Sequence, residues 1–213
     1  MKSSMPGSPM RTILLATNNP HKVREYKALL RGIPFTLVTP ADRDLRLAVE
    51  ESGSTLEENA IAKAREYAAA SGLLALSDDS GLEVEALGGE PGVKTARYAG
   101  PDASDEERNQ YLLRKLKGLP LDRRDAVFRC VIAIAEPNGQ VRLCEGRAEG
   151  YIAMEPRGAG GWGYDPVFLL PALNKTLAEL SPAQKNRYSH RGRAGRAAKR
   201  LLAQIGAKEE KNK

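Results

Sequence analysis

The stretch from Leu73 to Leu87, LLALSDDSGLEVEAL, places two adjacent acids between two segments with strand character. Its first segment, Leu73 to Leu76, is a short apolar run typical of a buried strand. Its second, Leu82 to Leu87, alternates apolar and charged residues, as a half-buried strand does. Two acids at the end of a buried strand are costly to leave unpaired. The stretch therefore predicts a strand end at which acidic side chains find a partner.

Strands and helices alternate on the N-terminal side of this stretch. Short apolar runs indicate strands, and helices begin at capping residues and end at glycine or proline. The predicted elements are strands at Thr12–Ala16 and Phe35–Val38, a helix at Pro20–Arg31, and a helix at Leu56–Ser71 that a capping box at Thr55–Glu58 opens and Gly72 ends.

A strand pair dominates the C-terminal side. Ala126–Ala135 is the longest strand candidate, and a turn at Pro137-Asn138-Gly139 leads back into Val141–Glu149 as a hairpin. The other predicted elements are a helix from Ser104 to Lys117, a strand at Val167–Leu170, a helix that starts at Ser181-Pro182, and a last helix from Arg191 to Ile205 that Gly206 closes. Alternation followed by a hairpin predicts a mixed α/β domain with a partly antiparallel sheet flanked by helices.

Composition sets the expected domain boundaries. The 213 residues, 41% of them hydrophobic, suit one domain with a real core, which we place at residues 11–206. Residues 1–10 are polar and lack the apolar centre of a secretory signal, so we expect a disordered extension or an artificial remnant there. Residues 207–213 are expected to form a basic tail.

Several classes of protein are excluded or left open by composition. No run approaches the roughly 18 apolar residues of a membrane span, so no membrane association is expected. Cys130 and Cys144 lack a metal-binding spacing and are expected to be buried reduced thiols, which favours a cytoplasmic location. The net charge of +6 is concentrated near the C-terminus. It is compatible with nucleic acid, with a polyphosphate steered into a cleft, or with a solvated helix face.

The segment Thr17-Asn18-Asn19-Pro20-His21-Lys22 is the first candidate site, because it lies between a buried strand and a helix start. A helix N-terminus offers unpaired N–H groups and a positive dipole end, and Lys22 adds a charge in the first turn. The segment is not a Walker loop, because that pattern is absent. An ordinary helix cap with a surface lysine is the alternative.

The acidic segment Asp78-Asp79-Ser80-Gly81 is the second candidate site. A divalent cation would compensate the acids, and Mg²⁺ prefers one or two carboxylates together with phosphate oxygens. Neighbouring side chains of a strand point to opposite faces, so one Asp can face a cleft while the other has a structural role. Glu50 and Glu51 could supply a further metal ligand. The alternative is an Asp-rich turn with both acids in water.

The glycine-rich loop Gly158–Pro166 is the third candidate. It formally matches G-x-G-x-x-G, but Pro166 and the apolar run behind it predict a strand, so a dinucleotide-binding turn is excluded. Its glycines allow the backbone to approach a ligand closely. Trp162 is the only tryptophan and could stack on a base, an interaction of about 1–3 kcal/mol. Packing in the core beside a tight turn is the alternative.

The fourth candidate comprises Lys185 and Ser189-His190-Arg191. His190 and Arg191 carry donors that suit a base carbonyl or a phosphate. A capping or surface role is the alternative for each residue.

Seven segments in one order closely resemble the inosine/xanthosine triphosphate pyrophosphatases, the Ham1-like nucleotidases. They are spread over nearly all of Arg11–Ile205, and their agreement in order makes the resemblance specific. The matching segments are Ala16–Lys22, Glu58–Ala64, Ser77–Leu82, Leu87–Gly92, Ala96–Tyr98, Gly163–Pro166 and Ser189–Gly192. The sequence departs from the family pattern at Asn18, where the family often has Gly, and at Trp162, where it usually has Phe.

The resemblance implies a long central sheet and two lobes around a nucleotide-binding cleft. It also implies a homodimer that uses Mg²⁺ to convert ITP, dITP and XTP to the monophosphate and pyrophosphate. By position, Asp79 would be the catalytic carboxylate with Ser80 beside it, and Thr17 to Lys22 would hold the triphosphate. The nucleoside would contact Trp162, Gly163, Tyr164, Asp165, Lys185, His190 and Arg191.

A mechanism follows as a hypothesis. Asp79 orients or deprotonates the attacking water, and Lys22 stabilises the developing charge. Asp79, with Glu51 and with Glu50, ligates the metal. Asn59 and Lys63 are four residues apart on one predicted helix, so they share a face that borders the cleft or pair with each other at the surface.

Two rival functions remain open at this level. A Maf-like pyrophosphatase would share the reaction and prefer other bases. A nucleic-acid-binding module would use the basic C-terminal helix, but the scarcity of aromatic residues argues against a stacking surface for single strands. We therefore expect a purine nucleoside triphosphate as substrate, and no specific nucleic acid as partner.

Overall fold

The computed structural model describes the backbone of residues 11–210 and the side chains of residues 11–207. The predicted extension and the last residues of the predicted tail lie outside this range. Among the described residues, no helix combines the length and apolar character that crossing a bilayer requires.

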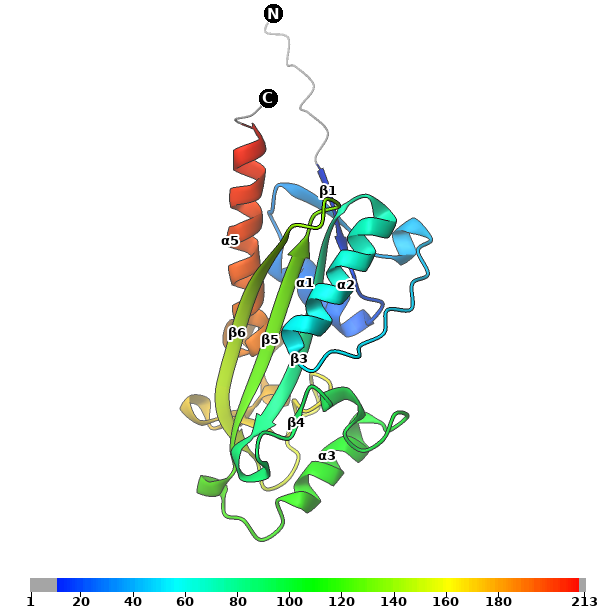
Figure 1. Cartoon of the computed structure of the whole chain (residues 1–213). Coiled ribbons are helices and arrows are strands. Elements are labelled where there is room, and N and C mark those ends of the chain that lie inside the picture. Colours follow the sequence, from blue (N-terminus) through cyan, green and yellow to red (C-terminus); the bar gives the residue numbers. More distant parts are fainter. Residues whose placement is uncertain (1–10, 211–213) are drawn as a thin grey trace, which may run out of the picture.

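A single mixed sheet runs through the whole molecule (Figure 1). Its order is β2-β1-β3-β5-β6-β7-β8, with β4 paired to β3. The β1 strand lies parallel to both of its neighbours, and all other pairs are antiparallel. The predicted mixed sheet is therefore confirmed. The strands are β1 (Arg11–Leu15), β2 (Phe35–Val38), β3 (Leu74–Val84), β4 (Pro91–Gly92), β5 (Asp125–Ala135), β6 (Val141–Ile152), β7 (Phe168–Leu170) and β8 (Lys175–Thr176).

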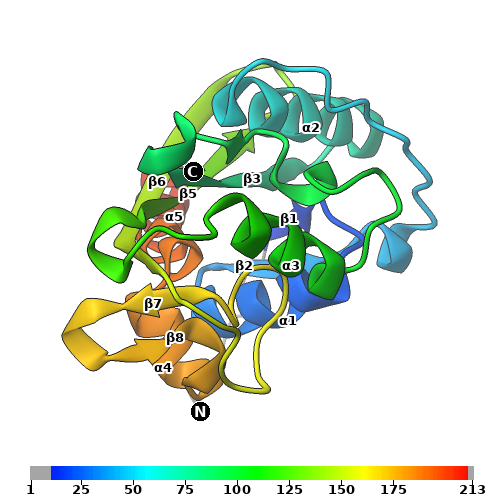
Figure 2. The ribbon, with the colours of Figure 1, turned by 90° about the horizontal axis from the view of Figure 1, so that it is seen from below.

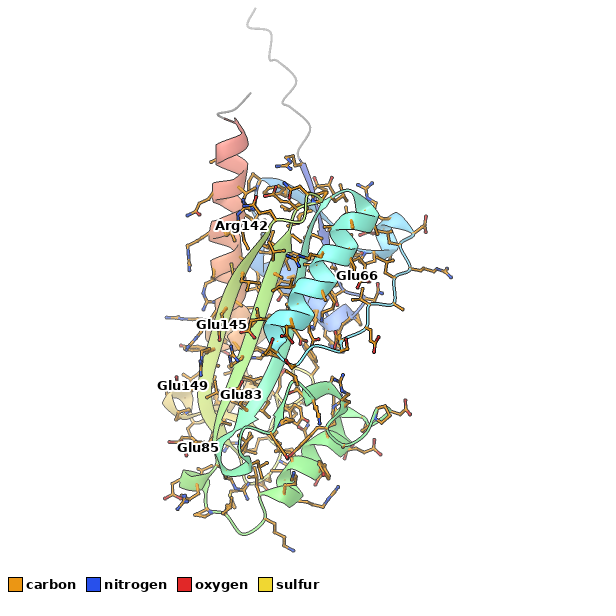
Figure 3. The ribbon with its side chains drawn as sticks, viewed as in Figure 1. Glu66, Glu83, Glu85, Arg142, Glu145 and Glu149 are labelled. Carbon is orange, nitrogen blue, oxygen red and sulfur yellow. The ribbon has the colours of Figure 1, made fainter. Side chains whose placement is uncertain are left out.

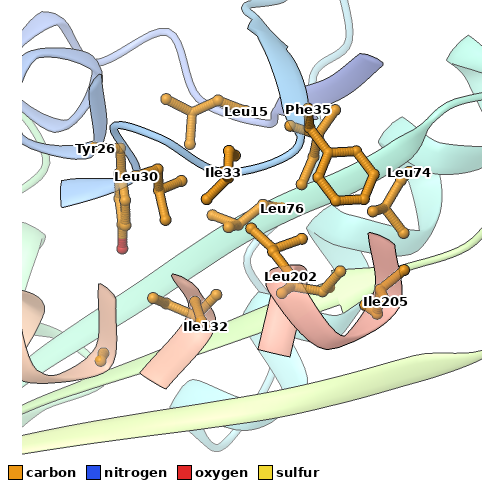
Figure 4. Packing of buried hydrophobic residues seen from close by; sticks show 14 of the residues in the cluster. Leu15, Tyr26, Leu30, Ile33, Phe35, Leu74, Leu76, Ile132, Leu202 and Ile205 are labelled. Carbon is orange, nitrogen blue, oxygen red and sulfur yellow. The ribbon is translucent and has the colours of Figure 1, made fainter. Parts of the chain in front are cut away.

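Helices cover both faces of the upper sheet and build a separate lower lobe. The α-helices are α1 (Pro20–Leu29), α2 (Leu56–Ser71), α3 (Asp105–Lys115), α4 (Pro182–Tyr188) and α5 (His190–Glu210). In Figure 1, α2 and α5 lie against opposite sides of the long strands, and α3 lies below them. On the α1 and α5 side, Tyr26 and Leu202 pack over Leu76 and Ile132 (Figure 4). The lower lobe has its own core around Leu112, which also includes residues of β7.

The acids of the opening stretch lie in the middle of β3, so the predicted strand end is wrong. The strand is continuous from Leu74 to Val84. It pairs with β5 from Ala75↔Ala135 to Val84↔Ala126, which gives the polar segment a complete backbone ladder. The acidic side chains are compensated by cations from helices rather than by water in a turn.

The end predicted for the last helix is also wrong. Helix α5 continues through Gly206 to Glu210, so the backbone of residues 207–210 is helical. A Cβ at Gly206 would lie 2.5 Å from Cγ of Pro34. This glycine therefore permits close packing of α5 against the turn before β2, and it is not a helix cap. By contrast, the capping box at Thr55 and the left-handed Gly72 after α2 are confirmed.

The sheet face that α2 covers continues beyond the start of this helix, and there it carries charged side chains. Arg129 of β5 lies there among the carboxylates of Glu57, Glu83 and Glu145, at 2.9–3.3 Å. Figure 3 shows Glu145 near the middle of the sheet and Glu83 further down. The positive charge of Arg129 is therefore compensated on this face of the sheet.

Candidate active site

A cavity of about 680 Å³ lies between the two lobes, a size that suits a small ligand. Both lobes contribute to it: α1, α2, β3 and α5 from above, and α3 with the glycine-rich loop from below. Most of the residues predicted from the sequence line it. These are Thr17, Asn18, Asn19, His21, Lys22, Glu51, Asp79, Ser80, Trp162, Gly163, Tyr164, Asp165, His190 and Arg191. Pro20, Glu50 and Lys185 are not among the lining residues.

The start of α1 forms a cationic end of the cavity. Asn19 is the N-cap, and its Oδ1 accepts hydrogen bonds from the N–H groups of His21 at 2.9 Å and Lys22 at 3.3 Å. These two N–H groups are thus already bonded, and the cap interpretation holds for Asn19. Lys22 is not a surface lysine: its side chain is 14% exposed and its Nζ lies 2.9 Å from Oδ1 of Asp78.

Asp78 is a buried ionic centre. It receives Lys22 on one oxygen, and on Oδ2 it accepts a hydrogen bond from Nε of Arg191 at 3.1 Å. Burial alone would raise the pKa of Asp78, but the charges of Lys22 and Arg191 hold that pKa below its usual range. Asp78 is therefore ionised and fixes one cation of α1 and one of α5 at the cavity wall.

Asp79 faces α2. Its Oδ2 accepts a hydrogen bond from Nδ2 of Asn59 at 3.1 Å, and its Oδ1 lies 3.6 Å from Nζ of Lys63. Burial raises the pKa of Asp79, and the charges of Lys63 and Lys22 only partly oppose this effect. The shared helix face of Asn59 and Lys63 thus borders the cavity wall, as one of the two predicted alternatives stated.

The carboxylates of Glu51 and Asp79 suit a hard divalent cation. Nζ of Lys63 lies 2.6 Å from Oε1 of Glu51 and also contacts Asp79, so two carboxylates converge on one positive charge. Glu50 is exposed, so Glu51 is the member of that pair that reaches the cavity. Among the described residues, no three His, Cys, Asp or Glu side chains are arranged so that they alone could hold a metal ion. One or two carboxylates completed by phosphate oxygens is the arrangement that Mg²⁺ prefers.

Trp162 forms an aromatic and cationic end of the cavity. Its ring stacks on His21, with ring centroids 5.7 Å apart and an interplanar angle of 23°. Cζ of Arg191 lies 4.9 Å from the ring centroid, and the indole Nε1 donates to Oε1 of Glu25 at 3.2 Å. The indole is half-buried and lines the cavity, so it is held in place and still presents an aromatic surface to a ligand.

Glu25 organises this end, and sequence reasoning missed it. Its carboxylate accepts from Lys185 at 2.7 Å and from Arg191 at 3.1 Å. Lys185 also binds Asp165, so it supports the loop from behind the cavity wall. One signal was available: Glu25 follows Lys22 by three residues on α1, which places both on one helix face.

His190 provides a neutral, buried ring. It stacks on Phe128, which was not predicted, with centroids 4.1 Å apart and an interplanar angle of 11°. Burial and the neighbouring cations Arg191 and Lys185 lower the pKa of His190 well below its usual value. Its Nδ1 is buried and has no hydrogen-bond partner among the described residues. A neutral imidazole with a free ring nitrogen can donate to or accept from a nucleobase.

The remaining predicted residues brace the cavity wall. Oγ of Ser80 accepts from Nη2 of Arg191 at 3.0 Å. The hydroxyl of Tyr164 donates to the carbonyl of Thr95 at 3.1 Å, and Asp165 accepts from the backbone N–H of Trp162 at 2.8 Å. Each of these residues therefore has an anchoring contact of its own.

Fold and site together define an α/β protein whose cavity combines cations and carboxylates with an aromatic surface on which a ligand ring can stack. The model of the Ham1 family matches residues 13–201. The dITP/XTP pyrophosphatase of Thermus thermophilus is 53% identical over 87% of this chain and 88% of its own. That of Desulforamulus reducens is 48% identical over 93% and 98%. The chain belongs to the Ham1 family.

Solved structures agree with this assignment. A HAM1 protein from Coxiella burnetii superposes with a TM-score of 0.84 at 44% identity, covering 92% of this chain and all of that one. A protein from Mycobacterium abscessus, described as nucleoside-triphosphatase / dITP/XTP pyrophosphatase, gives 0.70 at 38% identity over 91% and 99%.

Proposed function

We propose that this protein hydrolyses ITP, dITP and XTP to the nucleoside monophosphate and pyrophosphate, and so removes aberrant purine nucleotides from the precursor pool. One observation carries the proposal: a carboxylate with a raised pKa, Asp79, shares a cavity with Lys22, Lys63 and the aromatic end at Trp162. The names of the relatives support the same reaction.

Asp79 and Glu51 would hold Mg²⁺ together with phosphate oxygens of the substrate. When bound, the cation neutralises phosphate charge and makes pyrophosphate a better leaving group. Lys63 now lies between these two carboxylates. Its flexible side chain can turn from the carboxylates to the phosphates, because an ammonium group binds either as a point charge.

Water is the nucleophile in this reaction, and Asp79 is the group that orients or deprotonates it. In the metal-free cavity, burial raises the pKa of Asp79, which favours a carboxylate that can accept a proton. Water adds to the α-phosphorus as the bond to the bridging oxygen of the β-phosphate breaks. Lys22 stabilises the negative charge that develops.

Base selection would rest on His190 and Arg191. Their donors suit the 6-oxo group of hypoxanthine and xanthine. Adenine presents an amino group at this position, which would leave buried donors unpaired and cause strong rejection.

The basic C-terminal helix does not favour nucleic-acid binding. Arg193 donates to the carbonyl of Arg147 at 2.8 Å, Arg196 donates to that of Arg187 at 2.9 Å, and Lys199 donates to that of Arg31. Each of these three cations thus donates to a backbone carbonyl of the protein itself. They do not form a row of cations that are all free to bind phosphates. A homodimer and a cytoplasmic location complete the proposal; the free thiols of Cys130 and Cys144 support the second.

Replacement of the proposed base tests the function. Asp79→Asn keeps an acceptor for Asn59, so we expect the fold and nucleotide binding to persist while kcat falls about 10²–10⁴-fold. The measurement is release of pyrophosphate against orthophosphate from ITP, XTP, dTTP and UTP with Mg²⁺. Asp102→Asn, on an exposed loop residue, is the control and should match the wild type.

Two outcomes would count against the proposal. Near wild-type turnover of Asp79→Asn would remove Asp79 from the mechanism. Preferred hydrolysis of dTTP or UTP, or release of orthophosphate alone, would replace the proposed reaction with another.

A further inference from the structure

Helix α3 holds both backbone groups of one residue in the glycine-rich loop. The N–H of Gly163 donates to Oδ2 of Asp105 at 2.6 Å, and its carbonyl accepts from Nδ2 of Asn109 at 3.0 Å. Asp105 and Asn109 are four residues apart and so lie on one face of α3. Viewed from below, the loop passes between α3 and α1 (Figure 2).

The neighbouring residue, Trp162, packs toward the opposite wall. Its ring lies on His21 and its Nε1 bonds to Glu25, both on α1. Two successive residues of the loop therefore connect the lower lobe to the helix at the cationic end of the cavity. Gly163 adopts a φ of +63°, a left-handed conformation that favours glycine, so the backbone turns sharply between the two attachments.

Asp105 and Asn109, which together clamp Gly163, lie on a helix that is itself well anchored. Asn109 is only 4% exposed, and Leu112 on the next turn of α3 is fully buried in the lower-lobe core. Ser104 caps the helix, and its side chain is joined to Glu107 in a complete capping box. A shift of α3 would thus move Gly163, and with it Trp162, rather than being absorbed by a loose helix end.

We propose that Asp105 and Asn109 are positioning residues for base selectivity, which set the spacing between Trp162 and His21. The inference rests on the proposed function for its substrate, but the clamp can be tested without turnover. Asp105 also lines the cavity and its Oδ1 pairs with Arg108. No contact of Asp105 or Asn109 is to the acids or lysines at the phosphate end, so we expect the effect on base selection rather than on the chemical step.

The first test uses fluorescence, because Trp162 is the only tryptophan of the chain. Asn109→Ala removes the donor to the Gly163 carbonyl, and we expect the Trp162 emission to shift and its response to IMP to weaken. Gln110→Ala is the matched control: an amide on the next position of α3, but exposed. An unchanged emission in a folded Asn109→Ala protein would overturn the proposal.

The second test separates positioning from general damage. Asp105→Ala should lower the ratio of kcat/KM for ITP over GTP about 10- to 100-fold, since small misplacements have effects of this size. Asp105→Asn retains an acceptor oxygen and should restore most of the ratio. Binding of inorganic pyrophosphate, measured by calorimetry, should be unaltered in both variants. Equal losses for ITP, GTP and pyrophosphate would contradict the proposal.

The two tests also separate this inference from the proposed function. If the wild-type protein hydrolyses no triphosphate, the proposed function fails, while the Trp162 emission of Asn109→Ala still decides whether α3 positions the loop. If ITP is hydrolysed but neither emission nor selectivity responds to the α3 variants, only the further inference fails.

Discussion

Asp78 and Asp79 are neighbours on β3, yet they face different surroundings. Asp78 points to α1 and α5, where Lys22 and Arg191 each bind one of its oxygens. Asp79 points to α2, where the nearest cation, Lys63, is 3.6 Å away and is held more closely by a second carboxylate. As a consequence, the pKa of Asp78 is lowered and the pKa of Asp79 is raised.

The difference shows that burial alone does not decide the role of an acid. Both carboxylates lose solvation, but only Asp78 receives full compensation from opposite charge. A compensated carboxylate is a structural tie, because its charge is satisfied before any ligand arrives. An under-compensated carboxylate remains able to bind a cation or a proton, which is what a catalytic group needs.

The largest expected effect is on stability, from Asp78→Asn. An amide carries no charge and can accept from only one of the two cations, so the buried charges of Lys22 and Arg191 lose compensation, although Arg191 keeps Glu25 and Lys22 keeps the backbone carbonyl of residue 78. We expect the free energy of unfolding to fall by about 3–5 kcal/mol. Urea denaturation of this variant and of Asp102→Asn provides the measurement and its control. A loss under about 1 kcal/mol would show that Asp78 does not stabilise the fold by holding the cations of α1 and α5.

Part of this comparison could be predicted from the sequence. Strand alternation placed the two acids on opposite faces whether or not the strand ended there. Which acid is compensated could not be predicted, because Arg191 lies 113 residues further along the chain and reaches Asp78 only after α5 has packed on the sheet. Glu25 was missed for a similar reason, since its partners Lys185 and Arg191 come from α4 and α5.

The fold shows the same division between local and distant causes. The cap at Thr55 and the turn after Gly72 depend on nearby residues, and both were predicted. The continuity of β3 depends on the pairing with β5, and the role of Gly206 depends on Pro34, which is distant in the sequence. Local patterns therefore predict elements well, but not where a partner extends them.

A smaller effect of opposite sign is expected from Asp79→Asn. Because burial disfavours the ionised form of Asp79, removal of its charge should raise the free energy of unfolding by about 0.5–2 kcal/mol at pH 7 in metal-free protein. The amide keeps an acceptor for Asn59, and Lys63 keeps Glu51. The measurement is again urea denaturation, with a chelator present. Destabilisation of this variant would mean that both acids are structural ties.

The smallest effect is the pH dependence of these differences. A group with a raised folded pKa makes the folded state bind more protons, so stability increases as the pH falls through that pKa. The advantage of metal-free Asp79→Asn over the wild type should therefore fade on acidification. For Asp78 the sign is reversed: its contribution is fully present above the unfolded pKa and is lost progressively as the pH falls from that value to the lowered folded value. The deficit of Asp78→Asn should thus be constant above the usual pKa range of Asp and shrink below it. An advantage of Asp79→Asn that grew on acidification would make the two faces of β3 electrostatically alike.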